Sequence, residues 1–519
     1  MTPAEVIAWM EDEGNTIGLD VAGEVVEIVI DYVPSGFSLG NLEVFPKLST
    51  LKVNYTGAFC DRHMTGICRL KSIQIFEADY CEEISESGLS VLSELPKLES
   101  VKLRNCEAIY SIKSLANCRN LKTVDLSYNE QLDFQALKDL LTLNQLETLV
   151  LKDNPSLEND HLRWVSRFKA LKKLDLGNCR SITDEGLLNL TGLQHLQELD
   201  LSNNSQLNGS SLNQVDFPQL HTLNINQCAF SNQTFINLSR FTTLQAIRFE
   251  FNEDIDGDGL RLFEKLDQLH HLEVHSIHWT DTHLKCLKNM TKLQFVDFSR
   301  CAQITAEGLS QLSSPQILKS LQLKDCPRIN SAAMATILKC SEIEVLNLDG
   351  TAIRPDSLQE ISKLNNLRFL DLSHCKWLDD STVKMISGLA NLEVLYLADV
   401  PLLTDQSLTH LQNLSSLRKL KITRNENLDL SGFSTWNSGS RLDFLELGQL
   451  SRLGPTGLEN LAGLSNLQTL VLRQRNISIE MLSALHGVSN LITLELEGIY
   501  DSVAHRRLLN SLPKIAEQK

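Results

Sequence analysis

The sequence has little positive charge for its length, no long apolar run and no sign of a leader segment. Of its 519 residues, 48 are Lys or Arg and 65 are Asp or Glu, which gives a net charge of −17. DNA and RNA are bound through basic surfaces, so this acidic balance speaks against a nucleic-acid partner. A run of about 18 apolar residues is missing, so no membrane-spanning helix is expected. The first residues lack a basic segment followed by an apolar one, so no secretory signal is predicted.

The motifs that usually carry catalysis are also missing. The sequence has no serine-centred nucleophile elbow, no His-Glu-x-x-His pattern and no glycine-rich phosphate loop. It has no Cys-x-x-Cys pair of the zinc-binding type, and no tract rich in Gly, Ser or Pro that would separate a second domain. We therefore expect a protein that is not an enzyme, needs no cofactor and forms one domain.

What the sequence has instead is one pattern written many times. The pattern reads L-x-x-L-x-L-x-x-[N/C] and occurs nineteen times between Leu48 and Leu491, with a fainter copy at Val25–Ile30. From Leu98 onward, successive copies are 23 to 25 residues apart. The steps from Leu48 to Leu70 and from Leu70 to Leu98 are 22 and 28 residues, so the early repeats are expected to be irregular. A fixed period in this range predicts a solenoid in which each repeat supplies one short strand.

The repeat that begins at Leu171 shows how one unit is built. Leu174 and Leu176 share one face of a strand and point toward the core, while Asp175 points to the opposite face. Leu187 then begins an apolar spacing of three residues, which suits a short helical turn. Stacked repeats of this kind would place a parallel sheet on a concave side and short helices on a convex side.

Residues Leu171 to Leu193, with Cys179 at the end of the strand pattern and the turn at 182–187, resemble the leucine-rich repeat family. The resemblance is closest to its cysteine-containing branch, found in F-box/leucine-rich proteins and in related bacterial proteins. It covers nearly the whole chain and implies an α/β leucine-rich-repeat solenoid, a horseshoe of about twenty repeats that recognises other proteins. The twenty or so residues ahead of the first strand are too few for an F-box.

Both ends of the stack are expected to carry caps, because an open solenoid end exposes a sheet edge and part of the core. Thr2 followed by Pro3 predicts a capped helix near the start. Apolar residues between positions 501 and 518 predict a closing helix at the other end. We divide the chain into an N-terminal capping helix region (1–24), leucine-rich repeats (25–499) and a C-terminal capping helix (500–519).

The cysteines follow the repeat rather than a disulfide pattern. Six of the twelve occupy the last position of the pattern, namely Cys106, Cys179, Cys228, Cys301, Cys326 and Cys375. Other repeats have Asn at this position, such as Asn129 and Asn154. A side chain there points into the turn after the strand, where a small buried thiol fits as a weakly polar group. We therefore expect reduced thiols and a cytoplasmic protein.

Histidines are concentrated in one repeat. Five of the thirteen lie within fourteen residues, at His270, His271, His275, His278 and His283. His271 and His275 are about 13 Å apart along a strand, so they cannot share one ion. A metal site would need Glu273 with one histidine and help from Asp297 or Glu250 on a flanking strand, which makes His271, Glu273 and Asp297 the candidate ligands. The alternatives are a pH-responsive contact surface and an incidental polar surface.

The central outward positions of the predicted strands are mainly acidic. They hold Asp125, Asp175, Asp200, Glu273, Asp297, Asp371, Glu446 and Glu495, against Lys52, Lys102, Arg248 and Lys421. A mildly acidic concave face could steer a basic partner toward it. Asp175 and Asp200 are expected one strand apart and fully solvated, so that they repel by only about 1 kcal/mol and are not poised for acid catalysis.

Apolar and aromatic residues group at outward positions of the later repeats. They are Val345, Phe369, Val394 and Tyr396 in neighbouring repeats, with Phe295 and Phe444 further away. Grouped exposed aromatic side chains are typical anchors of protein interfaces. Asp371 lies beside them and could orient a cationic group of a partner. These seven residues are the predicted partner-binding residues.

The sequence thus predicts a monomeric scaffold or adaptor that binds another protein, one with a basic surface, on its concave face. Two alternatives stay open. One is the substrate-recognition subunit of a ubiquitin ligase that works with a separate F-box-type chain. The other is a metal-binding site around Glu273. Neither nucleic acid nor a membrane is expected as a partner.

Overall fold

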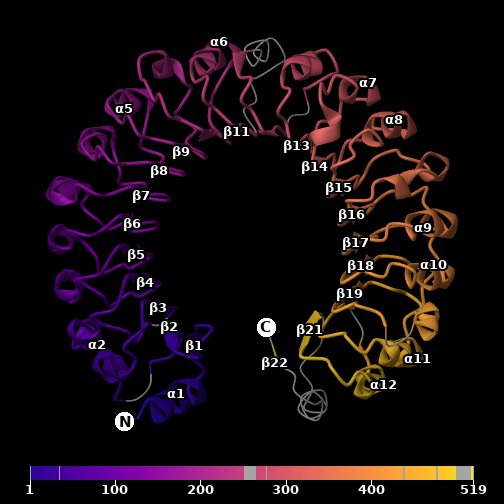
Figure 1. The fold of residues 1–519 in the computed structure, drawn as a ribbon, viewed down its shortest axis with the longest axis horizontal. Coiled ribbons are helices and arrows are strands. Elements are labelled where there is room, and N and C mark those ends of the chain that lie inside the picture. The colour runs from indigo at the N-terminus through magenta and orange to yellow at the C-terminus, as the bar shows by residue number, and fades with distance from the viewer. Residues whose placement is uncertain are drawn as a thin grey trace. The chain divides into compact units, whose positions relative to one another are not determined.

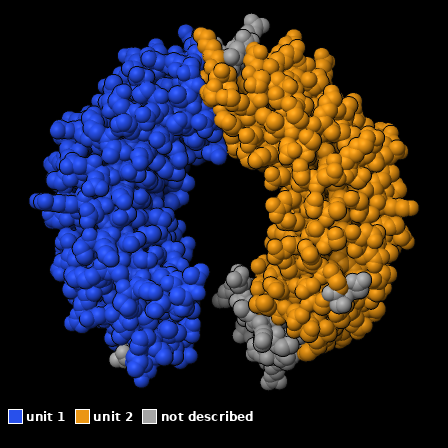
Figure 2. Space-filling view, in the orientation of Figure 1, with its two compact units in different colours: residues 1–255 blue, residues 256–519 orange. Residues whose placement is uncertain are grey.

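The computed structural model describes residues 2–33, 36–55, 57–250, 265–275, 278–436, 439–474 and 477–497, and the backbone of 516–517. The chain forms two compact units, residues 1–255 and residues 256–519 (Figure 2). We refer to them as unit 1 and unit 2.

Unit 1 is built on a sheet in which β2 to β11 run parallel, each paired with the next strand of the sequence. The strands are β1 (Thr16–Leu19), β2 (Val25–Ile30), β3 (Thr50–Asn54), β4 (Ile75–Asp79), β5 (Ser100–Arg104), β6 (Thr123–Asp125), β7 (Thr148–Val150), β8 (Lys173–Asp175), β9 (Glu198–Asp200), β10 (Thr222–Asn224) and β11 (Ala246–Arg248).

Unit 2 repeats this arrangement, with parallel pairing from β12 through to β22. Its strands are β12 (His271–Glu273), β13 (Phe295–Asp297), β14 (Ser320–Gln322), β15 (Val345–Asn347), β16 (Phe369–Asp371), β17 (Val394–Tyr396), β18 (Lys419–Thr423), β19 (Phe444–Gly448), β20 (Thr469–Arg473), β21 (Thr493–Glu497) and β22 (Ala516–Glu517).

Short helices cover the side of each unit opposite its strands, so that in both units the strands line the concave side (Figure 1). The α-helices are α1 (Pro3–Asp12), α2 (Asp61–Met64), α3 (Glu86–Ser90), α4 (Leu162–Val165), α5 (Asp184–Leu188) and α6 (Asn232–Phe235) in unit 1, and α7 (Ala306–Leu309), α8 (Met334–Ile337), α9 (Asp380–Ile386), α10 (Asp405–Leu411), α11 (Pro455–Glu459) and α12 (Ile479–Ala484) in unit 2. Short 3₁₀ helices complete many repeats. In the described part of the chain, no helix has both the length and the apolar character needed to cross a bilayer.

The predicted solenoid is confirmed, and its repeats fold as the alternation of the pattern requires. In β8, Leu174 is fully buried between the outward-facing Lys173 and Asp175, and the next leucine, Leu176, is fully buried as well. Equivalent leucines of neighbouring repeats lie opposite one another, as Leu174 does with Leu199 of β9. Each repeat therefore buries its apolar face only against the repeats before and after it.

The early repeats are regular, which corrects the prediction drawn from Leu70. Leu51 of β3 pairs with Phe76 of β4, and Phe76 pairs with Val101 of β5, so the strands follow one another every 25 residues. The residue equivalent to Leu48 and Leu98 is therefore Ile73, which is fully buried. Leu70 is also buried, but it ends the 3₁₀ helix Ile67–Arg69 that precedes the strand. The sequence prediction had aligned Leu70 with the pattern in place of Ile73.

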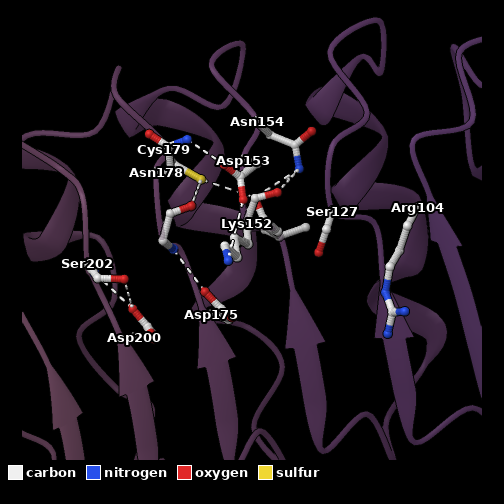
Figure 3. A network of polar contacts seen from close by, with 12 residues as sticks. Arg104, Ser127, Lys152, Asp153, Asn154, Asp175, Asn178, Cys179, Asp200 and Ser202 are labelled. Carbon is white, nitrogen blue, oxygen red and sulfur yellow. Dashed lines mark hydrogen bonds and ion pairs between the residues drawn. The ribbon is translucent and has the colours of Figure 1, made fainter. Parts of the chain in front are cut away.

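Where the last position of the pattern holds Asn or Cys, its side chain connects the repeat to the one before it. The Asn154 side-chain amide donates to the Leu126 carbonyl oxygen at 2.9 Å, and the Cys179 thiol donates to the Leu151 carbonyl oxygen at 3.1 Å (Figure 3). Both side chains are fully buried. No disulfide joins any of the twelve cysteines, which all lie in the described part of the chain.

The N-terminal end of the sheet is covered by a helix and a strand. Thr2 accepts a hydrogen bond from the Glu5 backbone N–H while the Glu5 side chain accepts one from the Thr2 N–H, which forms a capping box at the start of α1. The helix was expected, but β1 was not: it pairs antiparallel with β2 and occupies the edge that β2 would otherwise expose. Of the predicted C-terminal helix at 500–519, residues 500–515 and 518–519 lie outside the described residues, and 516–517 form β22 beside β21.

Candidate functional site

The parallel register places outward residues of successive repeats in columns on the concave side. In unit 2, Val345 of β15 lies opposite Phe369 of β16, and Phe369 lies opposite Val394 of β17. Lys419 and Phe444 continue the same column on β18 and β19. Adjacent members of a column are about 4.8 Å apart along the sheet. Val345, Phe369 and Val394, which were predicted to be neighbours, therefore lie next to one another on three adjacent strands.

Tyr396, the last residue of β17, joins this column, and we call Val345, Phe369, Val394, Tyr396 and Phe444 the apolar strip. The rings of Phe369 and Tyr396 meet edge to face, with centroids 5.2 Å apart at an interplanar angle of 78°. This geometry is favoured by the ring quadrupoles and holds the two side chains against one another. Each member of the apolar strip is half-buried, so one part of the side chain packs against the sheet and the other part contacts solvent.

Phe444 is not isolated from the strip, because Lys419 bridges the gap. The Lys419 ammonium lies 4.2 Å from the centroid of the Phe444 ring and 5.8 Å from that of Tyr396. A cation over two aromatic faces is attracted to both. Phe295 does stand apart, since Ser320 of β14 lies between it and Val345. It is 40 % exposed, and its ring stacks on His271 at 5.8 Å.

A polar groove of about 470 Å³ runs beside the apolar strip, over β14 to β20. Its lining residues are Lys324, Asp349, Asp371, Ser373, His374, Tyr396, Ala398, Lys421, Thr423, Arg424, Glu446, Gly448, Gln449 and Arg473. Tyr396 belongs to both features, so the apolar strip and the groove form one continuous surface.

The carboxylates of the groove lie deep in it and are mostly paired. Asp349, 2 % exposed, accepts from Lys324 at 3.2 Å and contacts His374 Nδ1 at 2.6 Å. Glu446, 8 % exposed, contacts Lys421 at 3.1 Å and Arg473 at 3.0 Å. Buried charges are stabilised only when they are paired in this way. The groove thus holds charges of both signs in fixed positions.

Asp371 differs from the other two carboxylates of the groove. It is 7 % exposed, and its carboxylate accepts the Ser373 backbone N–H at 2.9 Å. Among the described residues, none forms an ion pair with it. Desolvation by burial raises the pKa of Asp371, with the Ser373 hydrogen bonds opposing the shift. A cationic group brought into the groove would be stabilised beside this carboxylate.

The histidine-rich repeat contains two imidazole–carboxylate contacts, and ligand atoms of Glu273 and His275 also lie within 4.8 Å of each other. His271 Nε2 lies 3.4 Å from a Glu273 carboxylate oxygen, and His275 Nε2 lies 3.0 Å from Asp297. Glu273 and Asp297 are opposite each other on β12 and β13. The structure therefore brings the candidate ligands His271, Glu273 and Asp297 to one small area, but each carboxylate there already contacts its own imidazole.

The acidic face of unit 1 is less solvated than expected. Asp175 and Asp200 do lie opposite each other on β8 and β9 (Figure 3), but both are half-buried. Burial, with the nearby Asp200 charge as the second cause, raises the pKa of Asp175 to about 6. The expectation of two fully solvated carboxylates is wrong, because the flanking strands and the turn after each strand cover them.

Sequence analysis missed Lys419 and the groove. Lys419 was passed over because a single lysine in an apolar column carries no signal until its neighbours are known. The groove brings together residues of the five strands β16 to β20 and of the turns that follow β14 to β19, and many of these, such as Arg424 and Gln449, lie at variable positions of the repeat pattern. Aligning the repeats on their strand register would have shown both.

Comparisons with known proteins agree on the fold. The model of the family described as Leucine Rich repeat matches residues 170–190 and 363–387. The TLR13–ssRNA13 complex is similar in structure, with a TM-score of 0.54 and 20% sequence identity over 88% of this chain and 64% of that one. A leucine-rich-repeat protein of Leptospira interrogans (TM-score 0.43, 20% identity, 83% of this chain and 92% of that one) and the yeast Rad7–Elc1 complex (0.46, 19%, 67% and 82%) are also similar. No curated protein matches the sequence.

Proposed function

We propose that this chain, a leucine-rich-repeat protein, is a non-catalytic binding module whose protein partner docks on the concave side of unit 2, over the apolar strip and the polar groove. The observation that supports this most is the continuity of the two features. Val345, Phe369, Val394 and Tyr396 are consecutive in space, and Tyr396 also lines the groove. Interfaces commonly combine an aromatic centre with a polar rim in this way.

The rigidity of the surface favours binding. The strip residues stand on strands whose leucines are fully buried behind them, such as Leu370 and Leu395. Phe369 and Tyr396 already support each other, so they lose little side-chain entropy when a partner covers them. The energy of apolar burial is then largely available for affinity.

The groove defines the polar part of the partner. It holds Asp349, Asp371 and Glu446 together with Lys324, Lys421, Arg424 and Arg473. Because most of these charges are paired with each other, we expect the partner to bring an apolar or aromatic residue to the strip and one cationic group to Asp371. Such contacts select a partner more than they add affinity.

The compartment proposed is the cytoplasm. Ten of the twelve free cysteines are buried, and burial raises the pKa of Cys106, Cys118 and Cys179 to about 12. Thiols of this kind persist in a reducing compartment, where disulfides are rare.

The test replaces both aromatic members of the strip, as Phe369→Ala with Tyr396→Ala. The immobilised chain and this variant are used to capture proteins from native lysate, and recovery is measured by quantitative mass spectrometry. We expect proteins captured by the parent chain to be recovered roughly tenfold less with the variant, because central aromatic anchors carry most of the binding energy.

The matched control is Trp377→Ala. Trp377 is an aromatic side chain of the same unit, 56 % exposed, but it lies in the turn after β16 and not on the strand face. Circular dichroism and thermal unfolding establish that both variants fold. Equal recovery with the double variant and with the parent chain would rule out the apolar strip as the docking surface.

A further inference from the structure

An exposed aromatic row lies in unit 1, at the position just before the last position of the repeat pattern. In the first five repeats this position holds Tyr32, Tyr55, Tyr80, Asn105 and Tyr128. Four of the seven tyrosines of the chain are thus in one column. They are 65 %, 74 %, 42 % and 42 % exposed, respectively. We call these four residues the tyrosine row.

The backbone holds the row in the same register as the strands. The Tyr55 N–H donates to the Asp79 carbonyl oxygen at 2.8 Å, and the Tyr80 N–H donates to that of Arg104 at 2.8 Å. Asn15 of the N-terminal cap fixes the first member, since its side-chain oxygen accepts the Tyr32 N–H at 2.9 Å. The Tyr55 and Tyr80 rings are stacked, with centroids 4.6 Å apart and an interplanar angle of 17°.

Three members of the row adopt a backbone conformation that does not favour tyrosine. Tyr55, Tyr80 and Tyr128 have φ of 51°, 57° and 61°, in the left-handed region. Other repeats place residues such as Asn178, Asp153 and Asn203 at this position, which tolerate positive φ at a lower cost. The turn therefore does not require tyrosine at this position. The repeated, exposed rings indicate instead that the side chains themselves have a role.

The surroundings of the row are acidic. The nearby basic side chains are already paired: Lys102 with Glu77 at 2.6 Å, and Arg104 with both Asp79 at 3.0 Å and Asp125 at 2.8 Å. The turns that follow the row add exposed glutamates, namely Glu82, Glu83, Glu107 and Glu130. A ligand of this row therefore meets aromatic faces flanked by carboxylates, and it must itself carry positive charge.

The spacing of the row fits a polyproline II helix. Such a helix advances about 9.3 Å per three-residue turn. Tyr80 and Tyr128 are two strands apart, which is about 9.6 Å along the sheet, with the smaller Asn105 between them. Successive prolines on one face of a polyproline II segment would therefore meet rings on alternate strands, such as those of Tyr80 and Tyr128. Aromatic surfaces bind such segments because little conformational entropy is lost.

We propose that the tyrosine row binds a proline-rich, basic peptide segment of another protein, extended along the column in the polyproline II conformation. The prolines pack against the tyrosine rings, and Lys or Arg residues of the peptide pair with the glutamates of the adjoining turns. Stacked aromatic rings also accept nucleic-acid bases, but the same glutamates repel phosphates. This surface is separate from the apolar strip of unit 2 and does not depend on it.

The test measures binding to the full chain by fluorescence anisotropy with a labelled peptide of repeated Pro-Pro-Arg triplets. Two further peptides and an RNA separate the contributions. Pro-Pro-Glu triplets keep the helix and reverse the charge; Gly-Ser-Arg triplets keep the charge and remove the helix; a single-stranded oligouridylate replaces the peptide. We expect the Pro-Pro-Arg peptide to bind, the Gly-Ser-Arg peptide to bind roughly tenfold more weakly, and the other two not to bind.

The variants use the residue that other repeats have at this position. Tyr80→Asn with Tyr128→Asn removes two rings while keeping a side chain suited to positive φ, and should weaken Pro-Pro-Arg binding roughly tenfold. Tyr80→Phe with Tyr128→Phe keeps the rings and should retain binding, and Tyr396→Ala in unit 2 should not affect it. Equal affinity for the Pro-Pro-Arg and Gly-Ser-Arg peptides, binding of the RNA in preference to the peptide, no peptide binding, or an unaffected Asn variant would each overturn the proposal.

Discussion

At the scale of single residues, the last position of the pattern holds Asn or Cys in many repeats, and both donate a hydrogen bond to the preceding repeat. Asn154 does so to Leu126, and Cys179 to Leu151. Asn adds a second bond, since the Asn154 side-chain oxygen accepts the Asn129 backbone N–H at 2.7 Å. A thiol forms weaker hydrogen bonds than an amide but is more apolar. Asn therefore stabilises the buried turn mainly through hydrogen bonds, and Cys mainly through apolar packing.

The half-buried Asp175 predicts a pH-dependent stability. Its pKa is about 6 in the folded chain, against an ordinary value of 3.8, so between these values the folded state binds more protons than the unfolded state. The free energy of unfolding therefore falls as pH rises from about 4 to about 6, and the loss is complete above that range. Asp175→Asn should raise the free energy of unfolding at pH 7 by about 1 to 2 kcal/mol.

Denaturant unfolding of the parent chain and of Asp175→Asn, at several pH values from about 4 to about 7.5, measures this effect. The stability difference should disappear at the acidic end, where the carboxyl group is protonated in both states. Asp216→Asn is the control, because Asp216 is exposed. A difference that stays constant across the range would show that the buried charge is not its cause.

At the scale of elements, the N-terminal cap does two things. Helix α1 buries Val6 and Met10 completely, and β1 pairs with β2 along its free edge. An uncovered edge strand with a row of unpaired backbone groups is a template for association with another chain. The cap is therefore as much a barrier to aggregation as a source of stability.

A chain that begins at Val25 tests the role of the cap. We expect it to self-associate more than the full chain, because β2 then exposes both its edge and the apolar residues Ile28 and Ile30. Size-exclusion chromatography with light scattering measures the change in mass. Thr2→Ala, which removes the capping box alone, should keep the mass of the full chain. An unchanged mass for the shortened chain would show that the edge is protected by other means.

An element is predictable from the sequence where residues close together in the chain determine it, and not where pairing with a distant segment does. Strand faces are predictable because leucines at every second residue, such as Leu174 and Leu176, leave one way to bury them. The register at Ile73 was mistaken because Leu70 satisfies the same local pattern, and only pairing with β3 and β5 decides between them. Strand β1 was missed because its pairing partner, and not its own sequence, makes it a strand.

The candidate sites were less predictable for the same reason. Phe369 and Tyr396 were found because they depart from the polar residues usual at outward positions. The tyrosine row was missed because it lies at a variable position of the pattern, and the early misalignment hid the equivalence of Tyr55, Tyr80 and Tyr128. Burial of Asp175 depends on the packing of its repeat against the neighbouring repeats, which no single repeat encodes.

At the scale of the whole molecule, stability is distributed along the stack, because each repeat contacts mainly its neighbours. A core substitution should therefore act locally. Leu174→Ala removes a fully buried side chain from β8 and should cost about 2 to 5 kcal/mol in that region. Hydrogen exchange measured by mass spectrometry should speed up in β7, β8 and β9, while β17 to β19 keep their protection.

Leu395→Ala in β17 provides the reciprocal control, since Leu395 is also fully buried. Its effect should appear in β16 to β18 and leave β7 to β9 as they are. Uniform acceleration across both units in either variant would mean that the chain opens as one cooperative block, contrary to the nearest-neighbour description.

The buried thiols give the molecule a set of internal reporters. Burial raises the pKa of Cys106 and Cys179 to about 12, so at neutral pH they are protonated and inert toward alkylating agents. Each becomes reactive only when its own turn opens to water. A pulse of iodoacetamide, read out peptide by peptide, would therefore show which turns open and in what order, without any change to the sequence.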